Sequence, residues 1–186
     1  MRKLIGIALA AVLSLSFMLP GGRTAFADDF SCRGTLGAIT VDNLVVPDGA
    51  TCTLIGTRVE GNIFVETGAT LRASGVRVDG NVQAEGARLV VLSASAVGGS
   101  IQINQGRSAL IDRTFVNGDL QLEQNTGLLS VTRNRIGANA QINQNSGGVF
   151  IAGNRIAENL QCQANRPAPT GGGNVAGDKE DQCARL

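Results

Sequence analysis

The side chains best suited to chemistry in this chain are amides and carboxylates that recur at a nearly constant interval. They form two series: Gln83, Gln102, Gln121 and Gln141, and, two residues after each, Glu85, Asn104, Glu123 and Asn143. Residues two apart on a β-strand point to the same side of the sheet, so these side chains would form one polar strip. Such a strip can exchange hydrogen bonds with glycan hydroxyls or with a polar protein surface. Stacked amides also stabilise parallel strands on their own, and a purely structural ladder is therefore the alternative.

Two further polar series have a similar interval. One is basic and consists of Arg58, Arg77, Arg135 and Arg155. Stacked arginines repel one another, so we expect them to spread into solvent or to pair with carboxylates such as Glu60 and Asp79. The alternative is a contact with an anion or an acidic polysaccharide. The other series is Asn62, Asn81, Asn139 and Asn159, which we expect to form hydrogen bonds at a corner of the fold.

Residues for catalysis or metal binding are not grouped in this sequence. The chain has no His, and its carboxylates form neither a calcium-binding motif nor an evident catalytic pair. The repeats are nearly uniform in length, which leaves no long loops to build a cleft. Apart from Phe64 and Phe115, we expect no aromatic residue to act as a platform for a sugar ring. We therefore predict no catalytic residue, no metal site and no cofactor. A polysaccharide lyase or hydrolase is the alternative.

The polar series belong to a repeat that covers most of the chain. Its motif, Gly61-Asn62-Ile63-Phe64-Val65 in one copy, has copies that start at residues 42, 61, 80, 99, 118, 138 and 158, with a step of 19 and later of 20. One apolar column comprises Leu44, Ile63, Val82, Ile101, Leu120, Ala140 and Leu160, and a second comprises Val46, Val65, Ala84, Ile103, Leu122, Ile142 and Cys162. Alternation with period two is typical of a strand with one buried face. The glycine of the motif is expected to provide the positive φ angle of a sharp corner.

Two more strands follow in each repeat. The second is marked by pairs such as Val90/Leu92 and Leu129/Val131, and the third ends on residues such as Val78 and Ile136. We predict an all-β, single-domain, right-handed parallel β-helix of about seven rungs of 19–20 residues, with three short strands per rung. Antiparallel hairpins would not place identical residues beside each other, and a transmembrane barrel would need aromatic girdles that a chain without Trp or Tyr lacks.

The N-terminus has the features of an export signal. A basic start at Arg2 and Lys3, an apolar run from Leu4 to Leu19 and the sequence Ala25-Phe26-Ala27 predict a signal peptide over residues 1–27. We divide the remainder into an N-terminal cap (28–41), the β-helix (42–165) and a Pro/Gly-rich C-terminal cap (166–186). Removing the leader leaves 13 basic and 15 acidic residues, a net charge of −2 that argues against nucleic acid or anionic lipid as a partner. No other segment is expected to insert into a membrane.

The four cysteines of an exported chain are expected to form disulfides. The first two lie at the start of the coil and the last two at its end, and six steps of ~4.8 Å separate the first turn from the seventh. Because a disulfide needs Cα atoms within about 7 Å, we predict the pairs Cys32–Cys52 and Cys162–Cys183, which pin caps over both ends. The tail contains two prolines and three consecutive glycines. We expect it to form no further strand turn and to fold back over the last one, near Ile142, Ile151 and Ile156.

The C-terminal segments Asn159-Leu160-Gln161-Cys162, Thr170-Gly171-Gly172-Gly173-Asn174 and Asp181-Gln182-Cys183 resemble the ending of uncharacterised secreted actinobacterial proteins, among the short-rung right-handed parallel β-helix proteins of bacteria. From Asp42 to Cys162 the repeat is loosely similar to that of bactofilins, which are cytoplasmic and polymerise end to end. The resemblance implies a fold and no established activity. We expect a monomeric, non-catalytic protein, secreted or cell-wall-associated, whose polar strip binds an extracellular glycan or a surface protein. A self-assembling structural protein is a further alternative.

Overall fold

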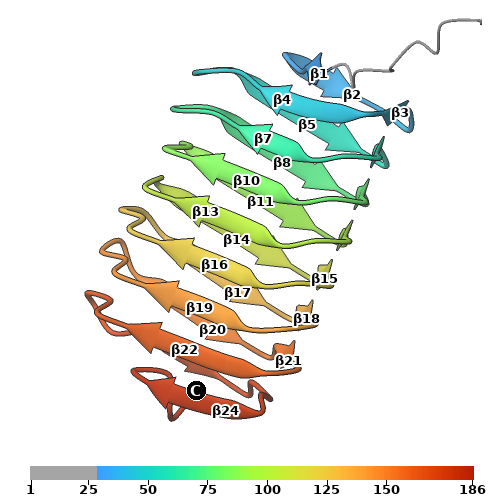
Figure 1. The fold of residues 1–186 in the computed structure, drawn as a ribbon. Coiled ribbons are helices and arrows are strands. Elements are labelled where there is room, and N and C mark those ends of the chain that lie inside the picture. Colours follow the sequence, from blue (N-terminus) through green and yellow to red (C-terminus); the bar gives the residue numbers. More distant parts are fainter. Residues whose placement is uncertain (1–28) are drawn as a thin grey trace, which may run out of the picture.

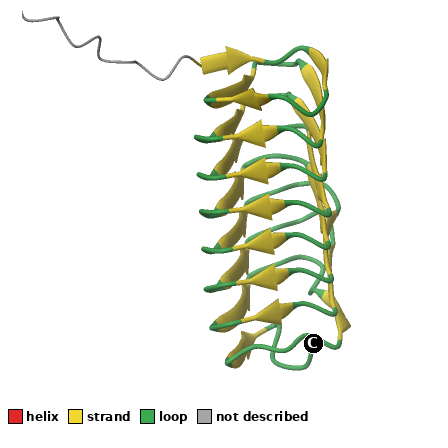
Figure 2. Cartoon of the chain, turned by 90° about the vertical axis from the view of Figure 1, so that its right-hand side faces the viewer, coloured by secondary structure: helices red, strands yellow, loops and turns green. Residues whose placement is uncertain are grey.

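The computed structural model describes residues 29–186, and the predicted signal peptide lies outside the described residues. The described chain winds into a stack of turns in which the same three strand positions recur (Figure 1). Equivalent strands of successive turns pair in parallel and form three long sheets. Figure 2 shows the stack from another side, with loops between the strands of every turn. The predicted all-β, single-domain parallel β-helix is therefore confirmed.

The first sheet carries the predicted polar strip on its outer face. In spatial order its strands are β1 (Asp29–Ser31), β4 (Asn43–Val46), β7 (Ile63–Val65), β10 (Val82–Glu85), β13 (Ile101–Asn104), β16 (Leu120–Glu123), β19 (Ala140–Asn143), β22 (Asn159–Gln163) and β24 (Asp178–Asp181). On its inner face, Val82, Ile101 and Leu120 stack in register and are fully buried. Both predicted apolar columns of this strand lie in the core. Because each layer buries a few aliphatic side chains, at ~1.5–3 kcal/mol each, only the stacked set offsets the cost of ordering the chain.

The other two sheets complete each turn. The second contains β2 (Gly34–Leu36), β5 (Thr51–Ile55), β8 (Thr70–Ser74), β11 (Leu89–Ser93), β14 (Ser108–Asp112), β17 (Leu129–Thr132), β20 (Val149–Ala152) and β23 (Thr170–Gly172). The third contains β3 (Thr40–Val41), β6 (Arg58–Val59), β9 (Arg77–Val78), β12 (Ala96–Val97), β15 (Phe115–Val116), β18 (Arg135–Ile136) and β21 (Arg155–Ile156). The predicted second and third strands thus exist, and their apolar markers, among them Leu92 and Ile136, are buried.

The stack is longer than the sequence predicted. The three sheets have nine, eight and seven strands, which corresponds to about eight turns where we predicted about seven. The difference arises at both ends. The segment predicted as an N-terminal cap contributes β1, β2 and β3, which pair in parallel with the turn that follows.

The C-terminal tail also forms strands, and the prediction that its prolines and glycines would prevent this is wrong. β23 pairs with β20, β24 pairs with β22, and Val175 makes an isolated bridge to Arg155. The prolines precede β23, where no ladder N–H is required of them. Gly171 and Gly172 extend the chain with backbone φ angles of 132° and 149°, which residues other than glycine rarely adopt. The tail does cover the preceding turn as predicted, since Gly171 pairs with Ile151.

The glycine of the repeat motif is required for space, and the expectation that it supplies a positive φ angle is wrong. Gly61 and Gly80 have no positive φ angle, whereas positive values occur at other corners, for example at Gly75 (62°). A Cβ atom at Gly80 would lie 2.5 Å from Asn62 Oδ1 and 2.6 Å from the Gly61 carbonyl oxygen of the preceding turn. A side chain at this position would therefore push successive turns apart.

The asparagine series at this corner forms hydrogen bonds, as predicted. Asn62 Oδ1 accepts hydrogen bonds from the backbone N–H of Asn81 (2.8 Å) and from its Nδ2 (3.1 Å). Ser100 and Asp119 continue the series where asparagine is absent: Ser100 N–H donates to Asn81 Oδ1 (2.8 Å), and Asp119 N–H donates to Ser100 Oγ (3.0 Å). Each turn is thereby tied to the next through one short polar side chain.

Both predicted disulfides are present, and they lie at opposite ends of the stack. Cys32 is bonded to Cys52 and Cys162 to Cys183, with Cα–Cα distances of 5.6 Å and 5.2 Å. All four cysteines are buried, so each bond joins a terminal segment to the core of the neighbouring turn. Disulfides of this kind are compatible with an extracellular or secreted protein.

Candidate functional site

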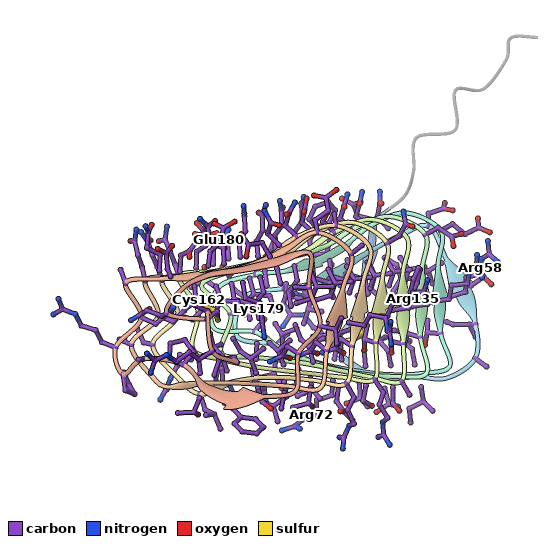
Figure 3. The ribbon with its side chains drawn as sticks, turned by 90° about the horizontal axis from the view of Figure 1, so that it is seen from below. Arg58, Arg72, Arg135, Cys162, Lys179 and Glu180 are labelled. Carbon is purple, nitrogen blue, oxygen red and sulfur yellow. A yellow bond between two sulfur atoms is a disulfide. The ribbon has the colours of Figure 1, made fainter. Side chains whose placement is uncertain are left out.

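The predicted strip residues lie together on the outer face of the first sheet. Gln83, Gln102, Gln121 and Gln141 are paired in register across β10, β13, β16 and β19, and Glu85, Asn104, Glu123 and Asn143 are paired in the same way. Glu85 is exposed and the others are half-buried. Glu180 continues the glutamine column on β24, and in Figure 3 it marks this face of the molecule.

Part of the glutamine column is a ladder. Gln83 Nε2 donates to Gln102 Oε1 (3.4 Å), and Gln102 Nε2 donates to Gln121 Oε1 (3.1 Å). These three side chains therefore form the structural ladder that was the alternative to a binding surface. A primary amide has two N–H donors and an oxygen with two lone pairs, so each ladder bond still leaves donor and acceptor capacity for a ligand.

The second column contains a polar atom without a partner. Asn104 Oδ1 is buried and accepts no hydrogen bond within the described chain. Buried polar atoms in folded proteins are paired in the large majority of cases. A water molecule or a ligand group donating to Asn104 would satisfy this atom.

A groove of about 490 Å³ runs over the N-terminal half of the strip. Its walls include four of the predicted residues, namely Gln83, Glu85, Gln102 and Asn104. The remaining four, Gln121, Glu123, Gln141 and Asn143, lie on later turns and do not line the groove. The structure therefore divides the predicted strip into a half that lines the groove and a half that lies outside it.

The groove also contains residues outside the predicted strip. Phe64, named above as a possible sugar platform, occupies the glutamine column one turn before Gln83. The carboxylates of Glu66 and Asp29 line the groove as well, together with Val45, Val65 and Ala84. Glu66 precedes Glu85 by one repeat, so the 19-residue step already contained this signal. Asp29 lies on β1, before the repeat begins, and no periodicity could have revealed it.

The predicted arginine series lies on the third sheet, where Figure 3 labels Arg58 and Arg135 on one side of the stack. Arg58 and Arg77 both contact Asp79, at 2.6 Å and 3.0 Å, and Arg58 also approaches Glu60 (3.6 Å), as predicted. The hydrogen bond from Arg77 and the nearby charge of Arg58 hold the pKa of Asp79 below its ordinary value.

The second sheet carries a basic groove that the sequence interpretation missed. This groove, of about 480 Å³, is lined by Thr51, Thr70, Arg72, Arg88, Leu89, Arg107 and Ser108. Arg88 and Arg107 lie 19 residues apart, each in a turn, and Arg72 lies on a strand of the preceding repeat. Strand alternation alone does not place these residues on one surface, because two of them lie in turns.

Comparisons of the chain with protein-family models, curated proteins and solved structures give no match. The likeness to bactofilins and to secreted actinobacterial proteins therefore stays a prediction. Within residues 29–186, no group of three or more His, Cys, Asp or Glu side chains is arranged to hold a metal ion. The same part of the chain contains no helix long and apolar enough to cross a membrane.

Proposed function

We propose that this protein is an exported, non-catalytic glycan-binding solenoid whose groove on the first sheet holds a neutral sugar chain. The observation that carries the proposal is the convergence of amides, carboxylates and one aromatic ring in that groove. Gln83, Gln102 and Asn104 supply amide donors and acceptors for sugar hydroxyls. Phe64 supplies an apolar face against which the C–H groups of a sugar ring can pack.

The charge of the groove favours a neutral glycan over an acidic one. Asp29, Glu66 and Glu85 line it, and no basic side chain does. An anionic sugar would meet these carboxylates at short range and be repelled, whereas hydroxyl groups can donate to them in charge-assisted hydrogen bonds. A parallel β-helix also holds the contact residues on rigid strands, which lowers the cost of ordering the site on binding.

Export supports the same role. The predicted signal peptide and the two disulfides both suit an oxidising compartment, where cell-wall and extracellular glycans occur. The proposal therefore includes that the protein is secreted or attached to the cell wall.

The test uses the mature chain, residues 28–186, on an array of neutral and acidic glycans. We expect retention of a neutral oligosaccharide, and a loss of affinity of about fivefold or more in the double variant Gln83→Ala/Gln102→Ala, because two amides worth roughly 0.5–1.5 kcal/mol each are removed. The matched control is Gln141→Ala/Gln161→Ala, in the same column but outside the groove. This control should bind like the wild type.

Equal binding by the two double variants would overturn the assignment of the groove. Retention of a protein and of no glycan would replace the proposed ligand class. Incubation of the bound oligosaccharide with the protein, followed by analysis of its length, tests the non-catalytic part of the proposal, since shortening would indicate an enzyme.

A further inference from the structure

The basic groove on the second sheet combines three arginines with hydroxyl groups and no acidic side chain. Arg72 lies on β8, and Arg88 and Arg107 lie in the turns before β11 and β14. All three side chains are exposed. Within the described residues, none of them forms an ion pair with a carboxylate.

The backbone places two of these arginines directly above one another. Arg107 N–H donates to the carbonyl of Ala87 (2.9 Å), and Ser108 N–H donates to the carbonyl of Arg88 (3.3 Å). Arg88 and Arg107 are therefore equivalent residues of consecutive turns, which are ~4.8 Å apart in a parallel sheet. Arg88 Nε in turn donates to Thr70 Oγ1 (3.1 Å), and because Thr70 is buried this bond orients the guanidinium and leaves its other N–H groups free.

Two other pairs of stacked arginines in the described residues have a carboxylate between them. Arg58 and Arg77 share Asp79, and Arg133 and Arg113 share Asp112. In both places the carboxylate offsets the repulsion between guanidinium groups of neighbouring turns.

The groove lacks such a carboxylate, so an anionic group of a ligand can take that place. Arg135 and Arg155 also stack without an ion pair in the described chain, but the cavity beside them is lined largely by apolar and glycine residues.

The donors in the groove suit an anion with several oxygens. Arginine presents N–H groups in a planar fork that matches sulfate, phosphate and carboxylate oxygens. Here three arginines and the hydroxyl-bearing residues Thr51 and Ser108 line one groove. This is more donors than the two oxygens of a carboxylate can accept, whereas a sulfate or phosphate ester offers three terminal oxygens.

We propose that the groove lined by Arg72, Arg88 and Arg107 binds a sulfate or phosphate group carried by an extracellular polymer. Figure 3 labels Arg72 and Glu180 on opposite sides of the stack, so this site lies away from the polar strip of the first sheet. It is independent of the proposed glycan groove, and both can be occupied at once.

Thermal unfolding of the mature chain in matched ionic strength is the first measurement. Inorganic sulfate or phosphate should raise Tm in a saturable manner, whereas chloride and acetate should not. The double variant Arg88→Ala/Arg107→Ala should weaken anion binding at least tenfold. The double variant Arg135→Ala/Arg155→Ala removes the same charge from the third sheet and should leave binding unchanged, as should Gln83→Ala/Gln102→Ala.

Dextran sulfate and dextran phosphate, whose esters each carry three terminal oxygens, then identify the carrier. They are compared with neutral dextran on the Gln83→Ala/Gln102→Ala variant, so that neutral-glycan binding at the first sheet does not contribute. Retention of one charged polymer in preference to the other assigns the group as a sulfate or as a phosphate, and equal retention of both supports a site for either. Absence of a saturable shift with both inorganic anions, or equal losses in the two arginine double variants, would overturn the proposal, since binding would then be absent or would reflect overall charge alone.

Discussion

Asp79 and Asp112 show how individual residues make stacked cations tolerable. Each carboxylate receives arginines from two positions, at 2.6 Å and 3.0 Å for Asp79 and at 2.9 Å and 2.6 Å for Asp112. Thr132 Oγ1 adds a hydrogen bond of 2.7 Å to Asp112. A single acidic residue thus neutralises like charges that the repeat would otherwise place next to each other. Exposed pairs of this kind contribute only about 0.2–1 kcal/mol each.

The pairing of Asp112 predicts a specific loss of stability in acid. Partial burial acts to raise the pKa of Asp112, but the hydrogen bond from Thr132 and the charges of Arg133 and Arg113 outweigh it and hold the pKa below the ordinary value of 3.8. The unfolded chain therefore binds this proton more readily, so the stabilisation is present above pH 3.8 and is lost as the pH falls through the lower folded pKa. Asp112→Asn should be less stable than wild type at neutral pH, on the order of 1 kcal/mol by urea unfolding.

That difference should shrink as the pH falls below 3.8. Asp48→Asn is the control, because Asp48 is exposed and forms no ion pair within the described chain. A constant difference between wild type and Asp112→Asn over the whole pH range would show that the carboxylate's charge is not the cause.

At the scale of the element, each turn is a set of strands joined by corners, and the corners depend on close contact between turns. Gly80 has no positive φ angle, but a Cβ at this position would meet Asn62 Oδ1 at 2.5 Å. Gly80→Ala should therefore destabilise the protein by about 1–3 kcal/mol through overpacking. Gly37→Ala is the matched control, since a Cβ there meets nothing within 4 Å. Chemical unfolding measures both, and equal stability of the two variants would contradict the steric role of the motif glycine.

The elements also show which features a sequence of this kind can predict. The column of Val82, Ile101 and Leu120 was predictable because strand alternation and a constant repeat length both mark it. The polar strip was predictable for the same reason, since Gln83 and Gln102 follow the same step. That only its N-terminal half lines a groove was not predictable, because the groove also depends on Asp29 and Phe64 at the N-terminal end of the sheet.

Two buried asparagine columns were missed altogether. They comprise Asn125, Asn145 and Asn165, and Asn134, Asn154 and Asn174. Asn145 is typical: its Nδ2 donates to the Leu122 carbonyl and to Asn165 Oδ1, both at 2.9 Å, and its Oδ1 accepts from the Asn125 N–H (2.9 Å). The sequence contains their 20-residue interval, but an asparagine in a turn is expected to be exposed unless the corner is known to point its side chain inward.

At the scale of the whole molecule, the ends of the stack are closed by residues outside the regular repeat. At the N-terminal end Phe30 pairs with Leu44 and lies over the first apolar column. At the C-terminal end Lys179 occupies the equivalent position beneath Leu160, and its Nζ donates to the Leu186 carbonyl oxygen (2.7 Å). Each turn of a solenoid packs only on its neighbouring turns, and the last turn has a neighbour on one side only. An unprotected end therefore exposes both an apolar layer and an unpaired strand edge.

The disulfide between Cys162 and Cys183 should hold the C-terminal closure in place. It spans 21 residues of sequence, and a loop of this size corresponds to about 3 kcal/mol of chain entropy. In the double variant Cys162→Ser/Cys183→Ser, which leaves no unpaired thiol, the tail over residues 166–186 should become sensitive to limited proteolysis. The exposed edge of β22 should then promote concentration-dependent association. Cys32→Ser/Cys52→Ser, at the other end, should leave the tail resistant. Light scattering and peptide mapping check both expectations, and a tail that stays intact without its disulfide would show that strand pairing by β23 and β24 alone closes this end.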